Sequence, residues 1–202
     1  MTRSLVVVSA GLRSPSTTKM LADDLTQQAV AALGGSPHVT HIEVREHAHA
    51  LADTLLTGFP TGALKEALDA VAAADGLIVV TPTFAASYAG LFKMFFDVLE
   101  PDALRDTPVL LAATGGTERH SLMLEHALRP LFNYLGAQTV RTAVFAATQD
   151  FGGAGVSDLQ TRIARAAAEL GAMIERRPVA SRQDEVAGLP AGVAPFAQLL
   201  RG

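Results

Sequence analysis

The 202-residue chain has the length of one domain and contains no cysteine, which excludes disulfides, thiolate metal sites and cysteine nucleophiles. Its formal net charge of −4 gives no general attraction to nucleic acid or anionic lipid. The longest apolar runs, such as Leu77–Val80 and Val109–Ala113, are far shorter than the ~20 residues of a membrane-spanning helix. The run Leu5–Val8 is too short for a signal-peptide core. We therefore expect a cytoplasmic protein that binds neither nucleic acid nor membranes.

Apolar runs bounded by turn or polar residues predict five β-strands, which are Leu5–Ser9, His38–Val44 (the weakest), Gly76–Thr81, Pro108–Ala113 and Thr139–Phe145. Helical apolar spacing lies between and after them, at Thr17–Leu33, Gly62–Ala74, Tyr88–Leu99, Arg119–Leu135 and Val156–Arg176, and a short extra helix is expected within His47–Gly58. Strands that alternate with helices indicate βαβ units and a parallel sheet.

Five such strands in this length favour an α/β, flavodoxin-like doubly wound parallel sheet of order 2-1-3-4-5, with helices on both faces. We expect this domain to span residues 1–177. Residues 178–202 are richer in glycine, proline and charge and are expected to form a C-terminal tail. Ligands of such sheets bind at the carboxyl ends of the strands, so the loops there are the candidates for a site.

The loop after the first strand, residues 9–18, gathers hydroxyl side chains and Arg13 at the start of a helix. A helix N-terminus offers free backbone N–H groups and partial positive charge, which suits a phosphate. The alternative is that Ser14 or Ser16 only caps the helix. The loop is neither a Walker A motif nor G-x-G-x-x-G, which disfavours a Rossmann dinucleotide site.

The loops after the third and fourth predicted strands suit a flat heterocycle. Residues 81–90 present backbone groups and the aromatic Phe84 and Tyr88. The turn after the fourth strand pairs Gly115 with Gly116, which lets backbone approach a ligand closely. The alternatives are an ordinary βα loop with its aromatics in the core and a simple glycine turn.

These loops resemble a known enzyme family. Residues 82–93 resemble the Pro-x-aromatic…Ser-Tyr-x-Gly-x-x-Lys loop of NAD(P)H-dependent FMN reductases. Residues 107–132, which carry Thr-Gly-Gly-Thr-Glu-Arg-His, are similar to the FMN reductases that serve two-component alkanesulfonate and methanesulfonate monooxygenases. The resemblance covers residues 4–170.

The resemblance implies three groups of FMN-binding residues. The phosphate would be held by Ser9, Arg13, Ser16, Thr17 and Thr18. The ribityl chain and the isoalloxazine edge would meet Pro82, Thr83, Phe84 and Ala85, with Ser87 and Tyr88 close by. The other side of the ring would meet Thr114, Gly115 and Gly116. The first loop departs from the family, because it begins Ser9-Ala10-Gly11 in place of Gly-Ser.

Charge and position make Arg119 and His120 candidates for the phosphates of the nicotinamide nucleotide. His126 occupies a position at which these reductases carry a residue that makes a π-bulge, and such bulges often mark functional sites. The alternative is a partly buried helical histidine. A metal site of two histidines with Glu43 or Asp53 is disfavoured against simple exposed polar positions, so we predict no metal.

The resemblance implies an NAD(P)H:FMN oxidoreductase, with FMN and either NADPH or NADH, that supplies reduced flavin to a flavin-dependent monooxygenase. Hydride transfer between stacked rings needs orientation rather than a general acid or base, so no side chain is assigned as catalytic. The alternatives are a quinone or azo-dye reductase that retains FMN, and a flavodoxin-type electron carrier.

We also expect a homodimer or homotetramer. The predicted helix Tyr88–Leu99 is apolar on nearly all sides, more than one buried face requires, and only 18% of residues are charged. Symmetric dimers and tetramers are the common assemblies. We expect this helix and the one that bears His126 to form the contacts.

Overall fold

The computed structural model describes residues 2–152 and 155–177, and the predicted tail lies outside them. Its central sheet has the order β2-β1-β3-β5-β6, with strands β1 (Ser4–Ser9), β2 (His38–Glu43), β3 (Gly76–Phe84), β5 (Pro108–Gly115) and β6 (Gln138–Thr139). These strands are parallel. The predicted flavodoxin-like order is confirmed, since these are the five predicted strands in chain order.

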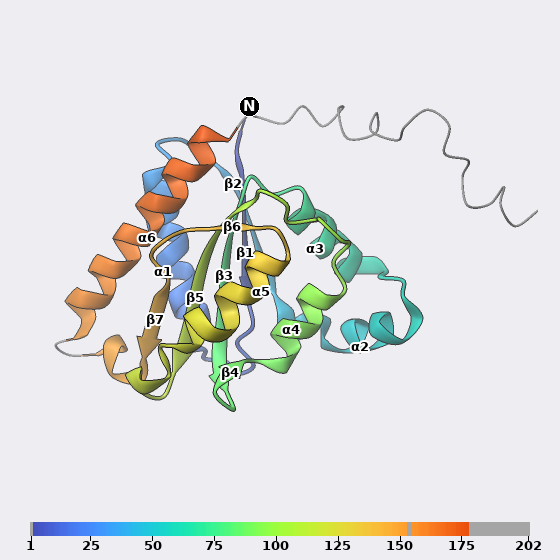
Figure 1. The fold of residues 1–202 in the computed structure, drawn as a ribbon, viewed down its shortest axis with the longest axis horizontal. Helices are drawn as coiled ribbons and strands as arrows, with labels where there is room; N and C mark the ends of the chain where they lie inside the picture. Colours follow the sequence, from blue (N-terminus) through green and yellow to red (C-terminus); the bar gives the residue numbers. More distant parts are fainter. Residues whose placement is uncertain (1, 153–154, 178–202) are drawn as a thin grey trace, which may run out of the picture.

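Helices cover both faces of the sheet because its central strands are apolar on both (Figure 1). Leu5 and Val7 pack with α1 (Thr17–Ala32) and α6 (Val156–Arg176). Val6 and Val8 belong to the core on the opposite face. That second face is covered by α2 (Ala48–Thr57), α3 (Gly62–Ala72), α4 (Gly90–Asp97) and α5 (Arg129–Tyr134).

The fifth predicted strand is wrong in one respect, because it is interrupted. Residues 138–139 form β6 and Val144–Ala147 form β7, and both pair with β5. Between them, Arg129 donates to the backbone oxygens of Val140 (3.0 Å) and Arg141 (3.3 Å), and the backbone N–H of Thr142 donates to a Glu169 carboxylate oxygen (2.7 Å). These side chains satisfy backbone groups that would otherwise need a strand partner.

Two predicted helices also differ from the structure. The predicted helix at 88–99 begins only at Gly90, because Ser87–Tyr88 forms strand β4, antiparallel to β3. The predicted helix at 119–135 is a 3₁₀ turn at Glu118–His120, a π-helix at Leu124–Leu128 and then α5. The expected π-bulge at His126 is confirmed. The short helix expected within 47–58 is α2, preceded by a 3₁₀ turn at Val44–His47.

The apolar residues of α4 are largely taken up inside the protomer. Phe92, Phe95 and Phe96 are buried, and the rings of Phe96 and Phe132 on α5 meet at a centroid distance of 4.9 Å. Because α4 lies between the sheet, α2 and α5, its apolar surplus does not by itself require a partner. Among the described helices, none combines the length and hydropathy needed to cross a bilayer.

Candidate functional site

A pocket opens at the carboxyl edge of the sheet, where the loops after β1, β3, β5 and β7 converge. Its volume is about 430 Å³. It is lined by Gly11, Leu12, Arg13, Pro15, Ser16, Thr17, Thr18, Pro82, Thr83, Phe84, Thr114, Gly115, Gly116 and Thr148. This is the edge at which doubly wound sheets bind ligands.

The loop after β1 is built around Ser16, which is the N-cap of α1. Its hydroxyl accepts a hydrogen bond from the backbone N–H of Lys19 (3.2 Å). The same hydroxyl lies against Gly11, where an added Cβ would approach its oxygen to 2.1 Å. A side chain at position 11 would therefore push the Ser16 hydroxyl out of its capping position.

Two threonine contacts hold the loops of the pocket together. The buried hydroxyls of Thr18 on α1 and Thr114 on β5 lie 2.9 Å apart. The hydroxyl of Thr81 donates to the backbone oxygen of Pro82 (3.0 Å) and accepts from the backbone N–H of Ala89 (3.0 Å). The two hydrogen bonds of the Thr81 hydroxyl therefore fix the chain on both sides of the β3–β4 hairpin.

The tip of that hairpin has an unusual backbone. Phe84 pairs with Ser87, so Ala85 and Ala86 form a two-residue turn, and both have positive φ (47° and 65°). Such turns favour Asn and Gly, because the left-handed region brings Cβ close to the following carbonyl oxygen. Strain of this kind clusters at functional sites.

The lining fits FMN at both ends. The N-terminal turn of α1, its hydroxyls and Arg13 suit the phosphate. At the other end the Thr83 hydroxyl is buried without a hydrogen-bond partner among the described residues, which leaves a polar atom for a ring edge. A Cβ at Gly116 would meet no atom within 4 Å, so this glycine leaves open space beside the pocket.

The structure brings most of the predicted site residues together, but not all. The following line the pocket as expected: Arg13, Ser16, Thr17, Thr18, Pro82, Thr83, Phe84, Thr114, Gly115 and Gly116. Ser9 lies at the end of β1 and lines a smaller neighbouring cavity instead. Ala85, Ser87 and Tyr88 belong to the hairpin that supports Phe84, and Arg119 and His120 are exposed on the turn beyond Gly116; none of these five lines the pocket.

Four lining residues were missed: Gly11, Leu12, Pro15 and Thr148. The first three belong to the loop of residues 9–18, in which the sequence already predicts a phosphate site. Thr148 follows β7, and the rule that ligands bind at carboxyl ends of strands applies to that strand too.

The three comparisons with known proteins agree with one another. The family model described as NADPH-dependent FMN reductase matches residues 3–152. The chain belongs to this family. An FMN reductase (NADPH) from Pseudomonas aeruginosa is 44% identical over 149 residues, which is 73% of this chain and 78% of the relative. An NADH-dependent FMN reductase, SfnE, from Pseudomonas putida is 43% identical over 143 residues, 71% of this chain and 76% of the relative.

Among solved structures, an oxidoreductase from Corynebacterium diphtheriae is 47% identical with a TM-score of 0.85, and the match covers 88% of this chain and 99% of that one. The family match covers the three loops of the pocket, which confirms the resemblance seen in their sequences. Relatives of similar identity carry NADPH in one name and NADH in another, so the nucleotide preference has to be sought in the chain's own residues.

Proposed function

We propose that the chain transfers a hydride from NAD(P)H to FMN and releases the reduced FMN to a flavin-dependent monooxygenase. The observation that carries this is the composition of the pocket. It joins an anion-binding helix start to a glycine-lined open side, and Arg13 is the one ionisable side chain among its described lining residues. A pocket without an acid–base pair suits a reaction that the flavin and nicotinamide supply when bound.

The chain's own residues bind and orient. Arg13 and the hydroxyls of Ser16, Thr17 and Thr18 hold the FMN phosphate, and Ser9 supports the loop from the end of β1. Thr83 donates to or accepts from the ring edge, while Gly115 and Gly116 let the ring approach the β5 loop. Ala85, Ser87 and Tyr88 position Phe84 above the pocket. Arg119 and His120 remain candidates for the phosphates of the nicotinamide nucleotide.

Release of the product follows from the exposure of the pocket's rim. The side chains of Leu12 and Phe84 both line the pocket and are both 48% exposed. An open rim of this kind supports the exchange of FMN with solvent, as a substrate requires. Free reduced FMN is the substrate that a flavin-dependent monooxygenase consumes.

Spectra and acceptor assays separate this function from its alternatives. After gel filtration we expect a colourless protein that oxidises NAD(P)H when FMN is added. A protein that stays yellow and reduces quinones or azo dyes without added FMN would indicate the flavin-retaining reductase. A protein that binds FMN but oxidises neither NADPH nor NADH would indicate an electron carrier.

A further inference from the structure

The side chain of Thr114 makes a contact that its position in the sequence does not suggest. Thr114 precedes Gly115 at the end of β5, and the sequence predicts that it meets the flavin ring together with the glycines. In the structure its hydroxyl lies 2.9 Å from that of Thr18, the second residue of α1. Thr114 and Thr18 are only 4% and 3% exposed. The hydroxyl of Thr114 thus links the ring end of the pocket to the phosphate end.

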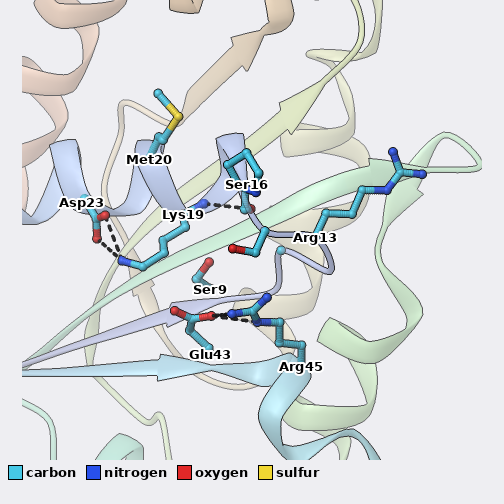
Figure 2. A pocket seen from close by; sticks show the side chains of 11 residues that line it. Ser9, Arg13, Ser16, Lys19, Met20, Asp23, Glu43 and Arg45 are labelled. Carbon is cyan, nitrogen blue, oxygen red and sulfur yellow. Dashed lines mark hydrogen bonds and ion pairs between the residues drawn. The ribbon is translucent and has the colours of Figure 1, made fainter.

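The start of α1 offers backbone donors to an anion. A helix opens with four N–H groups that have no intrahelical partner, and here they belong to residues 16–19. The Ser16 hydroxyl accepts a hydrogen bond from the N–H of Lys19 (3.2 Å; Figure 2). The N–H groups of Thr17 and Thr18 keep no intrahelical partner, which suits a phosphate. The place of Thr18 therefore decides where these donors point.

Two other cationic side chains beside this turn are already paired. Figure 2 shows the Lys19 ammonium on the carboxylate of Asp23 (2.9 Å). It also shows the Arg45 guanidinium on the carboxylate of Glu43 (2.8 Å), whereas Arg13 points away from both pairs. Recognition of a phosphate therefore rests on Arg13 and on how firmly the first turn of α1 is held.

We propose that Thr114 makes the pocket selective for a phosphorylated flavin by holding the Thr18 hydroxyl toward the 5′-phosphate of FMN. The inference rests on the proposed function, which makes FMN the ligand of this pocket. A hydroxyl donates one hydrogen bond and accepts up to two, whereas an ionised phosphate oxygen only accepts. When Thr18 donates to the phosphate, the hydrogen bond between the two threonines runs from Thr114 to Thr18. Thr114 is then a positioning residue that acts through Thr18.

The competing role for Thr114 is contact with the flavin ring. Such a contact would contribute equally to the binding of every flavin. Riboflavin carries the same ring and ribityl chain as FMN and lacks the phosphate. A comparison of FMN with riboflavin therefore separates the two roles.

The experiment titrates flavin fluorescence in the parent, Thr114→Val and Thr18→Val with FMN and with riboflavin. Valine has a shape similar to threonine and lacks the hydroxyl, and thermal melting confirms that each variant folds. We expect both variants to bind FMN roughly fivefold to fiftyfold more weakly, because a buried hydrogen bond at the phosphate end is lost. Their Kd for riboflavin should change by less than about twofold.

Thr26→Val is the matched control. Its buried hydroxyl lies on the same helix and donates to the backbone oxygen of Ala22 (2.6 Å), and Thr26 does not line the pocket. Its Kd for FMN should equal that of the parent. Thr114→Ser and Thr114→Ala form a second pair, which differs only in the hydroxyl, and we expect the serine variant to bind FMN more tightly.

The double variant Thr18→Val/Thr114→Val tests whether Thr114 acts through Thr18. It should lose no more FMN affinity than Thr18→Val alone, whereas independent contacts would multiply the two losses. Multiplied losses, equal weakening of FMN and riboflavin in Thr114→Val, or parent-like FMN binding by folded Thr114→Val would each overturn the proposal. Failure of the proposed function reads differently, since the parent would then reduce added FMN with neither NADPH nor NADH.

Discussion

At the scale of single residues, the site depends on one charge and on backbone that has no side chain to obstruct it. Arg13 is the one ionisable group among the described lining residues of the FMN pocket. Gly11 and Gly116 matter because they carry no side chain. The first leaves room for the Ser16 hydroxyl, and the second leaves open space beside the pocket.

Arg13→Ala should weaken FMN binding by ~1.5–3 kcal/mol, the range for a hydrogen bond to a charged group. Titration of flavin fluorescence measures this Kd. Arg105→Ala is the matched control, because its guanidinium pairs with Asp102 away from the pocket. An unchanged Kd in Arg13→Ala would remove this residue from the phosphate site.

Gly116→Val tests the planar end more cleanly than a change at Gly115. A Cβ at position 115 would lie 2.7 Å from the Phe145 ring, so a substitution there disturbs packing as well as the pocket. At position 116 a Cβ meets nothing within 4 Å. We expect Gly116→Val to melt at the parent temperature and to lose more than about tenfold in FMN affinity, equivalent to about 1.4 kcal/mol. Parent-like FMN affinity in a folded variant would place the ring elsewhere.

At the scale of elements, the β3–β4 hairpin and the π-helix are the two features that depart from regular structure. The hairpin carries Phe84 over the pocket on a strained turn. The π-helix is tied to the interrupted fifth strand by Arg129, which also donates to both carboxylate oxygens of Glu125 (2.7 and 2.9 Å).

Ala86→Gly should stabilise the fold by roughly 0.5–1 kcal/mol. Glycine removes a left-handed penalty of about 1–2 kcal/mol and gives back part of that gain in backbone entropy. Urea denaturation measures the difference. Ala63→Gly, in the exposed first turn of α3, is the opposite control and should destabilise by up to about 1 kcal/mol. Equal destabilisation by both variants would show that the turn is not strained.

Glu125→Gln should lower stability slightly at neutral pH and not at all in strong acid. The hydrogen bond from Arg129 lowers the pKa of the Glu125 carboxyl below its ordinary value of 4.5. A carboxyl with a depressed folded-state pKa stabilises the fold above that ordinary value and loses this contribution as pH falls through the folded-state pKa. Unfolding free energies of parent and variant, measured from pH 7 down to pH 3, should therefore converge. A difference that grows on acidification would contradict the assignment.

At the scale of the whole molecule, the exposed apolar residues lie off α4, but Leu122 (64%) and Tyr134 (88%) lie on the segment that bears His126, the other helix expected to form the contacts. The end of α2 and the loop after it expose Leu56 (86%) and Phe59 (77%). The expected homodimer or homotetramer stays a prediction, and light scattering at micromolar concentration tests it. We expect a molar mass of two or four chains for the parent, and a smaller molar mass for Phe59→Glu. A parent mass near 21.1 kDa would exclude the assembly.

Much of the fold and site follows from sequence because its signals are local. The apolar runs of β1, β3 and β5 are unambiguous. Each is followed by a loop whose hydroxyls or glycines predict a binding site. The interrupted fifth strand was not predictable, since it depends on Arg129 and Glu169 reaching it from other elements. The same holds for the smaller cavity that Ser9, Glu43 and Arg45 line, which forms only when β2 lies beside β1.

We conclude that this pocket serves an NAD(P)H-dependent reduction of FMN. The most direct measurement is the initial rate of NADPH and NADH oxidation by flavin-free protein as FMN is added. We expect a rate near zero without flavin that rises and saturates as FMN is added. A rate that does not respond to FMN with either nucleotide would contradict it.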